Sequence, residues 1–131
     1  MKGVIAAAGR GSRLFPLTKT VSKHLLPIYN KPLIYYPIST LINAGITDIC
    51  IVTNPNETSL YKQLLGNGSK YGCNFEFCEQ KKPKGIPDVL NCSRDVFGKV
   101  PVTLILGDNI FYGNELSRDL IRAKSFSGAT I

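Results

Sequence analysis

The chain has 131 residues, of which 44% are hydrophobic and 19% charged, and its formal net charge is +7. This size allows one compact domain with its own core and argues against two independent domains. No apolar run approaches the roughly 18 residues needed to cross a membrane, and the apolar run near the N-terminus, at about six residues, is too short for a signal peptide. We therefore expect a globular, cytoplasmic protein with no membrane partner.

Basic residues dominate the first third of the chain. Six lysines and arginines precede the first acidic residue, Asp48. A one-sided charge of this kind suits a polyanionic ligand, either a nucleoside triphosphate or a nucleic-acid backbone, although a solvated surface can carry it without any ligand. The sequence has no recognition-helix or zinc-finger pattern, so nucleic-acid binding rests on charge alone and is not expected.

The cysteines do not form a recognisable metal or redox motif. They stand at positions 50, 73, 78 and 92, without CxxC spacing, and the single histidine, His24, completes no familiar zinc pattern with them. We expect free thiols that pack as small hydrophobic groups, and no structural metal.

Hydrophobic periodicity predicts four strands alternating with four helices. Apolar or β-branched runs predict strands at 3–8, 46–53, 74–78 and 100–106. Helical spacing predicts helices at 33–44, 57–65, 88–97 and 115–124. Such alternation is typical of an α/β, Rossmann-like fold with a mainly parallel sheet and helices on both faces.

Several local features of these elements are also predicted. A turn is expected at 30–32, and Pro37 predicts a kink or a delayed start of the first helix. The stretch 79–88 is expected to be a loop, with Asp88 as the cap of the third helix. Asn114 is expected to cap the last helix, whose inward side would hold Leu116, Leu120, Ile121 and Ala123.

Three polar segments are predicted to meet at one edge of the sheet. In a parallel sheet, ligands bind at the carboxyl ends of the strands. Those ends lead here into residues 9–23, 80–88 and 107–109. We therefore place the candidate site at this edge.

The first of these segments has the character of a phosphate loop. Gly9 and Gly11 let backbone N–H groups turn towards an anion, and Arg13 and Lys23 add positive charge. The loop is no Walker A motif, because no Gly-Lys-Ser/Thr follows, and it fails the dinucleotide fingerprint because Leu14 stands where the third glycine would be.

The other two segments each offer one polar residue with two interpretations. Asp108 follows an apolar strand and is either a Mg²⁺ ligand or an ordinary turn residue. Gln80 has the donor and the acceptor needed to read a pyrimidine edge, but considered alone it is a surface glutamine.

Four stretches of the chain carry a family resemblance: AAAGRGSRLFPLT, VSKHLLPIYNKPLIYYPISTL, LLGNGSKYG and LGDNIFYG. On these motifs the chain resembles the sugar-1-phosphate nucleotidyltransferases, and among them the glucose-1-phosphate thymidylyltransferases. The resemblance implies a transferase that makes dTDP-glucose and pyrophosphate from dTTP and glucose 1-phosphate. UTP is the alternative nucleotide. It also implies Mg²⁺ as cofactor, and we expect a homo-oligomer.

The resemblance also implies roles for individual residues. Those lining the nucleotide triphosphate would be Ala8, Gly9, Gly11 and Ser12. Arg13 and Lys23 would be catalytic, neutralising charge as the sugar phosphate attacks the α-phosphorus. Gln80 and Gly85 would contact the base, and Asp108 would hold Mg²⁺.

The chain departs from the family pattern in two respects. Where the family usually has Gly-Leu-Ala followed by Gln or Glu and Ala, residues 85–89 read GIPDV. Members of the family are also more than twice as long. We therefore expect residues 1–131 to be the nucleotide-binding portion, with the sugar-binding portion absent. The alternative is an inactive homologue that acts as a nucleotide-binding or interaction module.

Overall fold

A four-stranded parallel sheet forms the centre of the molecule. The computed structural model describes residues 1–82, 84–113 and 115–131. The strands of this sheet, in the order β5-β4-β1-β6, are β5 (Asn74–Glu79), β4 (Asp48–Thr53), β1 (Lys2–Ala7) and β6 (Val102–Leu106). The α-helices are α1 (Tyr35–Asn43), α2 (Thr58–Leu65), α3 (Ile86–Phe97) and α4 (Leu116–Ala123). The predicted alternation and the parallel sheet are confirmed.

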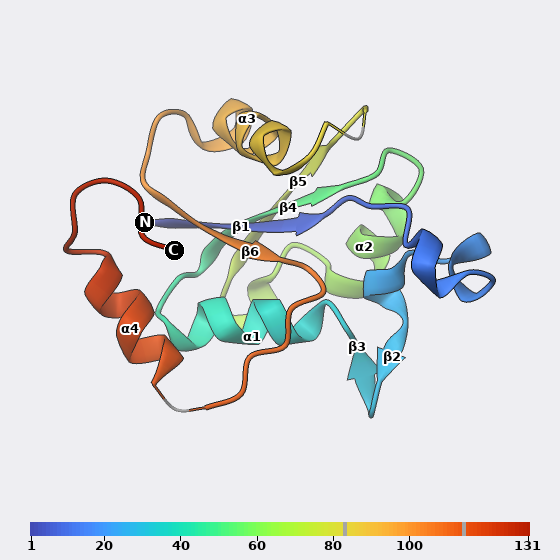
Figure 1. The fold of residues 1–131 in the computed structure, drawn as a ribbon, viewed down its shortest axis with the longest axis horizontal. Helices are drawn as coiled ribbons and strands as arrows, with labels where there is room; N and C mark the ends of the chain where they lie inside the picture. Colours follow the sequence, from blue (N-terminus) through green and yellow to red (C-terminus); the bar gives the residue numbers. More distant parts are fainter. Residues whose placement is uncertain (83, 114) are drawn as a thin grey trace.

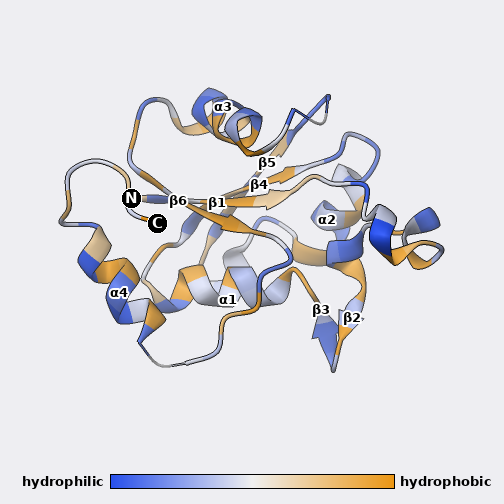
Figure 2. Cartoon of the chain, viewed as in Figure 1, coloured by the Kyte–Doolittle hydropathy of each residue, from blue (hydrophilic) through white to orange (hydrophobic). Residues whose placement is uncertain are grey.

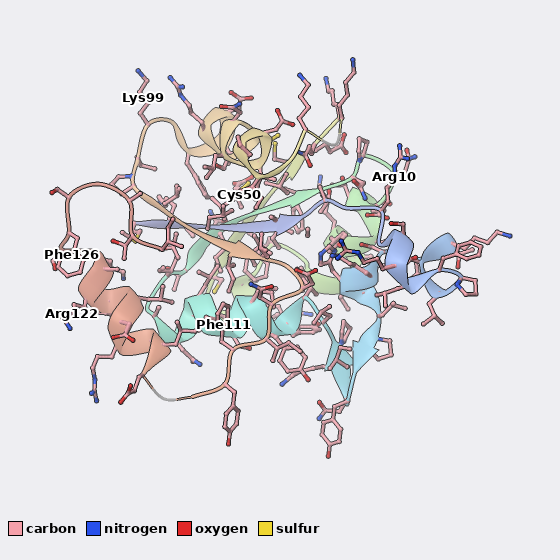
Figure 3. The ribbon with its side chains drawn as sticks, viewed as in Figure 1. Arg10, Cys50, Lys99, Phe111, Arg122 and Phe126 are labelled. Carbon is pink, nitrogen blue, oxygen red and sulfur yellow. The ribbon has the colours of Figure 1, made fainter. Side chains whose placement is uncertain are left out.

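Helices cover both faces of the sheet. Figure 1 shows α3 on one face and α1 and α4 on the other. Side chains alternate along each strand, so Val4 and Cys50 pack on the side of α3 while Ile5 and Ile51 join the larger core under α1 and α2. Figure 2 shows the hydrophobic residues concentrated along the strands and polar residues on the outer side of α3. Cys50 is labelled among the central strands in Figure 3.

The strand order reverses at β1. Chain order runs outward from β1 through β4 to β5, and then returns through α3 to β6 on the other side of β1. β1 is therefore paired on both sides. Its first residue pair with β4 is Gly3 and Ile49, and its first residue pair with β6 is Lys2 and Val102. Reversal of this kind leaves a crevice at the carboxyl ends of the two adjacent strands, here β1 and β6.

The segment between β1 and α1 differs from the prediction. Residues 30–32 were predicted to be a turn, but Lys31–Pro32 is a strand, β3, paired antiparallel with β2 (Pro27–Ile28). This hairpin lies away from the main sheet (Figure 1). The prolines in both strands hide the usual alternation of a hairpin, so sequence reasoning found only its turn character.

Helix α1 begins two residues later than predicted, at Tyr35. The N–H groups of Leu33 and Ile34 donate to the carbonyls of Leu26 and His24, which ties these residues to the preceding segment. Pro37 then falls within the first turn of the helix, where its missing N–H costs no helical hydrogen bond. The delayed start predicted from Pro37 is confirmed.

Helices α3 and α4 required two corrections. Helix α3 begins at Ile86 after Gly85, whose φ is 83°, so Asp88 lies in the first turn instead of capping the helix. Ile121 of α4, predicted to face inward, is 53% exposed, whereas Leu120 packs against the core. The predicted cap Asn114 lies outside the described residues. None of the helices in the described part of the chain is long and apolar enough to span a membrane.

Candidate functional site at the carboxyl edge of the sheet

Lys23 and Asp108 meet at the crevice between β1 and β6. Lys23 opens a short 3-10 helix, Lys23–Leu25, in the segment after β1, and Asp108 follows β6 by two residues. The Nζ atom of Lys23 donates to Oδ2 of Asp108 in an ion pair whose side chains are 24% and 37% exposed, respectively. Two residues predicted to be functional, from opposite ends of the chain, are thus in direct contact.

The ion pair stabilises the charged form of Asp108. The hydrogen bond from Lys23 lowers the pKa of Asp108 below its ordinary value, and this effect exceeds the opposing effect of burial. Asp108 is therefore ionised at neutral pH and acts as an acceptor only.

A pocket of about 350 Å³ surrounds this pair. Its walls come from the ends of β1 and β6, the 3-10 helix and the first turns of α3. The lining residues are Ala6, Ala8, Lys23, His24, Gln80, Gly85, Ile86, Val89, Leu106 and Asp108. Five of the nine predicted site residues lie in this one pocket: Ala8, Lys23, Gln80, Gly85 and Asp108.

Gln80 is held in a defined orientation at the entrance to α3. It is only 6% exposed, and its Nε2 atom donates to the carbonyl of Gly85 and to Oδ2 of Asp88, both at 3.0 Å. The surface-glutamine interpretation is therefore wrong. Because both amide protons are used, Oε1 is the atom through which Gln80 can accept a hydrogen bond.

The glycine loop folds back on itself next to the pocket. Gly11 has a φ of 57°, in the left-handed region that glycine tolerates, and its carbonyl accepts a hydrogen bond from Oγ1 of Thr18 at 2.8 Å. A Cβ atom at position 11 would lie 2.8 Å from Cγ2 of Thr18. The loop conformation thus requires glycine at this position.

The remaining predicted residues lie outside the pocket. Gly9, Gly11, Ser12 and Arg13 do not line it, and the side chains of Ser12 and Arg13 are exposed. Figure 3 shows Arg10 on the same loop, beyond the end of β1. The roles of these residues in holding a triphosphate therefore stay predictions.

Sequence reasoning missed the residues beneath the lysine. His24 lines the pocket and is 1% exposed, and its Nδ1 atom contacts the hydroxyl groups of Ser22 and Tyr61. Burial, reinforced by the positive charge of Lys23 and opposed by Asp108, lowers the pKa of His24 to about 4. The position of His24 next to Lys23 was the one sequence signal that could have linked it to the site. Its contact with Tyr61 spans 37 residues and leaves no local pattern.

The site offers one carboxylate to a metal ion. Among the described residues there is no group of three or more His, Cys, Asp or Glu side chains that could hold a metal. Asp108 alone, partly exposed and lining the pocket, fits Mg²⁺, which needs only one or two carboxylates when phosphate oxygens and water complete its shell. It does not fit Zn²⁺, which takes three or four protein ligands.

A second, larger cavity of about 630 Å³ lies along β5 and α3. Lysines 81, 82 and 84 and the acidic residues Glu79, Asp88 and Asp95 line it. It includes neither the glycine loop nor Asp108, so size alone does not make it the better candidate.

Comparison with known proteins identifies the family of the chain. The family model described as nucleotidyl transferase matches residues 2–131. The chain belongs to the nucleotidyl transferase family. Glucose-1-phosphate thymidylyltransferases from Xanthomonas campestris pv. campestris and from Mycolicibacterium smegmatis are each 48% identical to it. The matches cover 99% and 100% of this chain but only 44% and 46% of those proteins.

Solved structures of nucleotidyl transferases have the same fold. A protein from Bacillus anthracis described as a glucose-1-phosphate thymidylyltransferase, solved with sucrose, matches with a TM-score of 0.86 and 38% identity. A UDP-glucose pyrophosphorylase solved with UDP-glucose matches with a TM-score of 0.74 and 29% identity. Each match covers 95% of this chain, and 50% and 53% of the other chains. The chain therefore spans about half the length of its relatives.

Proposed function

We propose that this chain binds dTTP, with UTP as the alternative, together with Mg²⁺ in the pocket between β1 and β6. The observation that carries the proposal is the convergence of Lys23, Asp108 and Gln80, from three distant segments, on one pocket. The relatives named glucose-1-phosphate thymidylyltransferases support transfer of the nucleotidyl group to glucose 1-phosphate. The products would be dTDP-glucose and pyrophosphate.

The proposed reaction needs charge neutralisation more than a general base. An oxygen of the sugar phosphate attacks the α-phosphorus in line, and the bond from the α-phosphorus to the bridging oxygen breaks to release pyrophosphate. Lys23 would neutralise charge at the α-phosphorus, and Arg13 would bind triphosphate oxygens with its planar guanidinium. Bound Mg²⁺, held by Asp108, would supply further charge neutralisation on the triphosphate.

Base selection would depend on Gln80. Its amide nitrogen is engaged by Gly85 and Asp88, so it presents an acceptor to the base. Thymine and uracil carry a donor at N3, whereas cytosine carries an acceptor there. We therefore expect discrimination against dCTP, because its N3 would face Oε1 without a hydrogen bond. Asp88 belongs to the stretch that departs from the family pattern, and its side chain helps to orient the Gln80 amide.

Calorimetric titration tests the binding proposal. We expect dTTP and UTP to bind in the presence of Mg²⁺, and dCTP to bind at least about tenfold more weakly. The Asp88→Ala variant, which releases one amide proton of Gln80, should narrow this difference. Absence of dTTP binding, or equal affinity for dCTP, would contradict the proposal.

A second candidate is a nucleotide-binding module without turnover. The observation that favours it is that the residues converging on the pocket are those proposed for the nucleotide and Mg²⁺, and none of them is assigned to the sugar. A pyrophosphate-release assay with dTTP and glucose 1-phosphate separates the two. Release by the purified chain supports the transferase, whereas binding without release supports the module.

Self-association is also part of the proposal. β6 lies at one end of the sheet order, and Ile110 and Phe111, in the segment that follows it, are each 48% exposed. A sheet edge next to apolar surface favours pairing between copies of a chain. Sedimentation velocity should show a homo-oligomer, and a monomer at all accessible concentrations would contradict this expectation.

A further inference from the structure

Three buried polar groups meet beneath the nucleotide pocket. The hydroxyl oxygens of Ser22 and Tyr61 are 2.8 Å apart, and they lie 3.3 Å and 3.1 Å, respectively, from Nδ1 of His24. Ser22 is 3% exposed, His24 1% and Tyr61 0%. The three side chains come from two parts of the chain, because Ser22 and His24 flank Lys23 whereas Tyr61 belongs to α2.

The distances assign the protons of this cluster. If Ser22 donates to Tyr61 and Tyr61 donates to Nδ1, the two hydroxyl protons occupy the two shortest contacts. If Nδ1 carried the ring proton instead, either Tyr61 would donate to the carbonyl of Ala7 at the long distance of 3.5 Å, or Tyr61 would donate to Ser22 and the Ser22 proton would lack an acceptor among the contacts of the described residues. The geometry therefore favours an acceptor at Nδ1 and the ring proton on Nε2.

The Tyr61 hydroxyl is not explained by core packing. The ring of Tyr61 fills the core under β1, and a phenylalanine ring would fill the same space. A buried hydroxyl lowers stability unless it is hydrogen-bonded, so its presence in the core implies that its partners matter. The closest of those partners are the two residues on either side of Lys23, and the carbonyl of Ala7 is more distant, at 3.5 Å.

The same histidine also limits the position of the segment that carries Asp108. Gly107 packs so closely against His24 that a Cβ atom at position 107 would lie 2.7 Å from Cδ2 of the ring. Its N–H donates to the carbonyl of Ala6 at 2.9 Å. His24 thus contacts Ser22, which precedes Lys23, and Gly107, which precedes Asp108.

We propose that the Tyr61 hydroxyl is a positioning group for the nucleotide site, which fixes Ser22 and His24 and through them the placement of Lys23 opposite Asp108. The proposal rests on the proposed function as far as nucleotide affinity is concerned. Tyr61 itself touches no substrate in this scheme, since it is fully buried. Its effect must pass through the segment 22–24.

The variant Tyr61→Phe tests this, with Tyr35→Phe as matched control. Tyr35 is a tyrosine of α1 whose hydroxyl lies 3.0 Å from that of Tyr71, so its loss also removes one hydroxyl–hydroxyl contact but leaves the site untouched. We expect Tyr61→Phe to weaken binding of Mg²⁺ and dTTP about three- to tenfold, and Tyr35→Phe to leave it unchanged.

A spectroscopic readout separates positioning from general destabilisation. Because His24 is the only histidine, its imidazole nitrogens give one set of resonances in a ¹⁵N spectrum. We expect the Nε2–H tautomer in the unmodified chain. Tyr61→Phe should shift Nδ1 and the backbone amides of Lys23 and Asp108, whereas Tyr35→Phe should shift none of them.

Specific outcomes overturn the proposal. Unchanged nucleotide affinity in Tyr61→Phe, or equal weakening in Tyr35→Phe, would show that the hydroxyl has no positioning role. If the unmodified chain does not bind dTTP, the proposed function fails, but the amide shifts at Lys23 and Asp108 still test positioning, and unmoved shifts reject it. Should Tyr61→Phe fail to fold, Ser22→Ala removes the other hydroxyl of the cluster and is judged by the same criteria.

Discussion

Lys23 and Asp108 form an ion pair although 85 residues separate them in the sequence. The pair lies where the strand order of the sheet reverses, and it joins the segment after the first strand to the segment after the last. Lys23 and Asp108 neutralise each other in this pair. If the proposed function holds, Lys23 would exchange Asp108 for phosphate, and Asp108 would exchange Lys23 for Mg²⁺.

The first prediction concerns Asp108→Asn. The substitution keeps the shape of the side chain but removes the charge that would hold Mg²⁺. We expect dTTP affinity in the unmodified chain to rise when Mg²⁺ is added, and affinity in the variant to be about tenfold weaker and independent of Mg²⁺. Calorimetry with and without the metal measures both. A variant that keeps its response to Mg²⁺ would show that Asp108 is not the ligand.

Stability provides the control for this experiment. Both side chains of the pair are partly exposed, so the ion pair should contribute less than about 1 kcal/mol to the free energy of unfolding. Thermal unfolding of Asp108→Asn should therefore resemble that of the unmodified chain. A large loss of stability would make the binding result uninterpretable as a metal effect.

A second prediction separates Arg13 from other basic residues of the loop. Arg13 is exposed, so Arg13→Ala should not change stability, but it should weaken dTTP binding about tenfold through lost phosphate contacts. Binding of thymidine, which has no phosphate, should be unaffected. Lys19→Ala removes an exposed charge from the same loop and serves as control. Equal effects of the two variants would reduce the role of Arg13 to general electrostatics.

A third prediction compares two glycines. A Cβ atom at Gly107 would lie 3.0 Å from the carbonyl oxygen of Ala6 and closer still to His24, so Gly107→Ala should lower the free energy of unfolding by about 1–3 kcal/mol. At Gly9 a Cβ atom would meet nothing within 4 Å. Gly9→Ala should therefore fold normally and weaken only nucleotide binding. Chemical denaturation measures the first effect, and a stable Gly107→Ala protein would contradict the close packing.

A fourth prediction concerns pH. The pKa of His24 is lowered from 6.5 to about 4 by burial and by Lys23, with Asp108 opposing and Tyr61 as an uncharged neighbour. As the pH falls below 6.5, the unfolded chain binds a proton that the folded chain does not bind until about pH 4. The free energy of unfolding should therefore fall by about 3 kcal/mol over this interval.

The variant His24→Gln supplies the reference for the pH experiment. Glutamine cannot titrate, so the part of the fall in the free energy of unfolding between pH 6.5 and pH 4 that is due to His24 should disappear. The part due to carboxylates should remain. Urea denaturation at several pH values measures the difference. Parallel curves for the two proteins would mean that the imidazole titrates normally and is not buried as described.

Local sequence patterns predicted the elements whose stability is local. The apolar runs at β1 and β4 are buried on both faces, so composition alone revealed them, and the rule for parallel sheets then placed Lys23, Gln80 and Asp108 at one edge. The errors arise where a pairing outside the element decides. Residues 31–32, predicted to be part of a turn, form β3 because they pair with β2.

The candidate site was predictable only in part for the same reason. Its charged residues carry chemistry in their identity, so they were found without a structure. Tyr61 and Ser22 have no such identity, because a tyrosine in an amphipathic helix is ordinarily a core residue and a serine ordinarily a surface one. Only the 2.8 Å contact between them, across 39 residues, reveals their connection to the site.

The pairing of β1 with β6 has a consequence for how the molecule is made. Lys2 pairs with Val102, so β1 cannot pair with β6 until the chain has been made as far as that strand. Contacts between residues so distant in the chain form late, because closing the intervening loop costs entropy that only the formed interface offsets. Under the proposed function, nucleotide binding would then report the arrival of β6, and a nascent chain that ends before Asp108 should remain unable to bind dTTP.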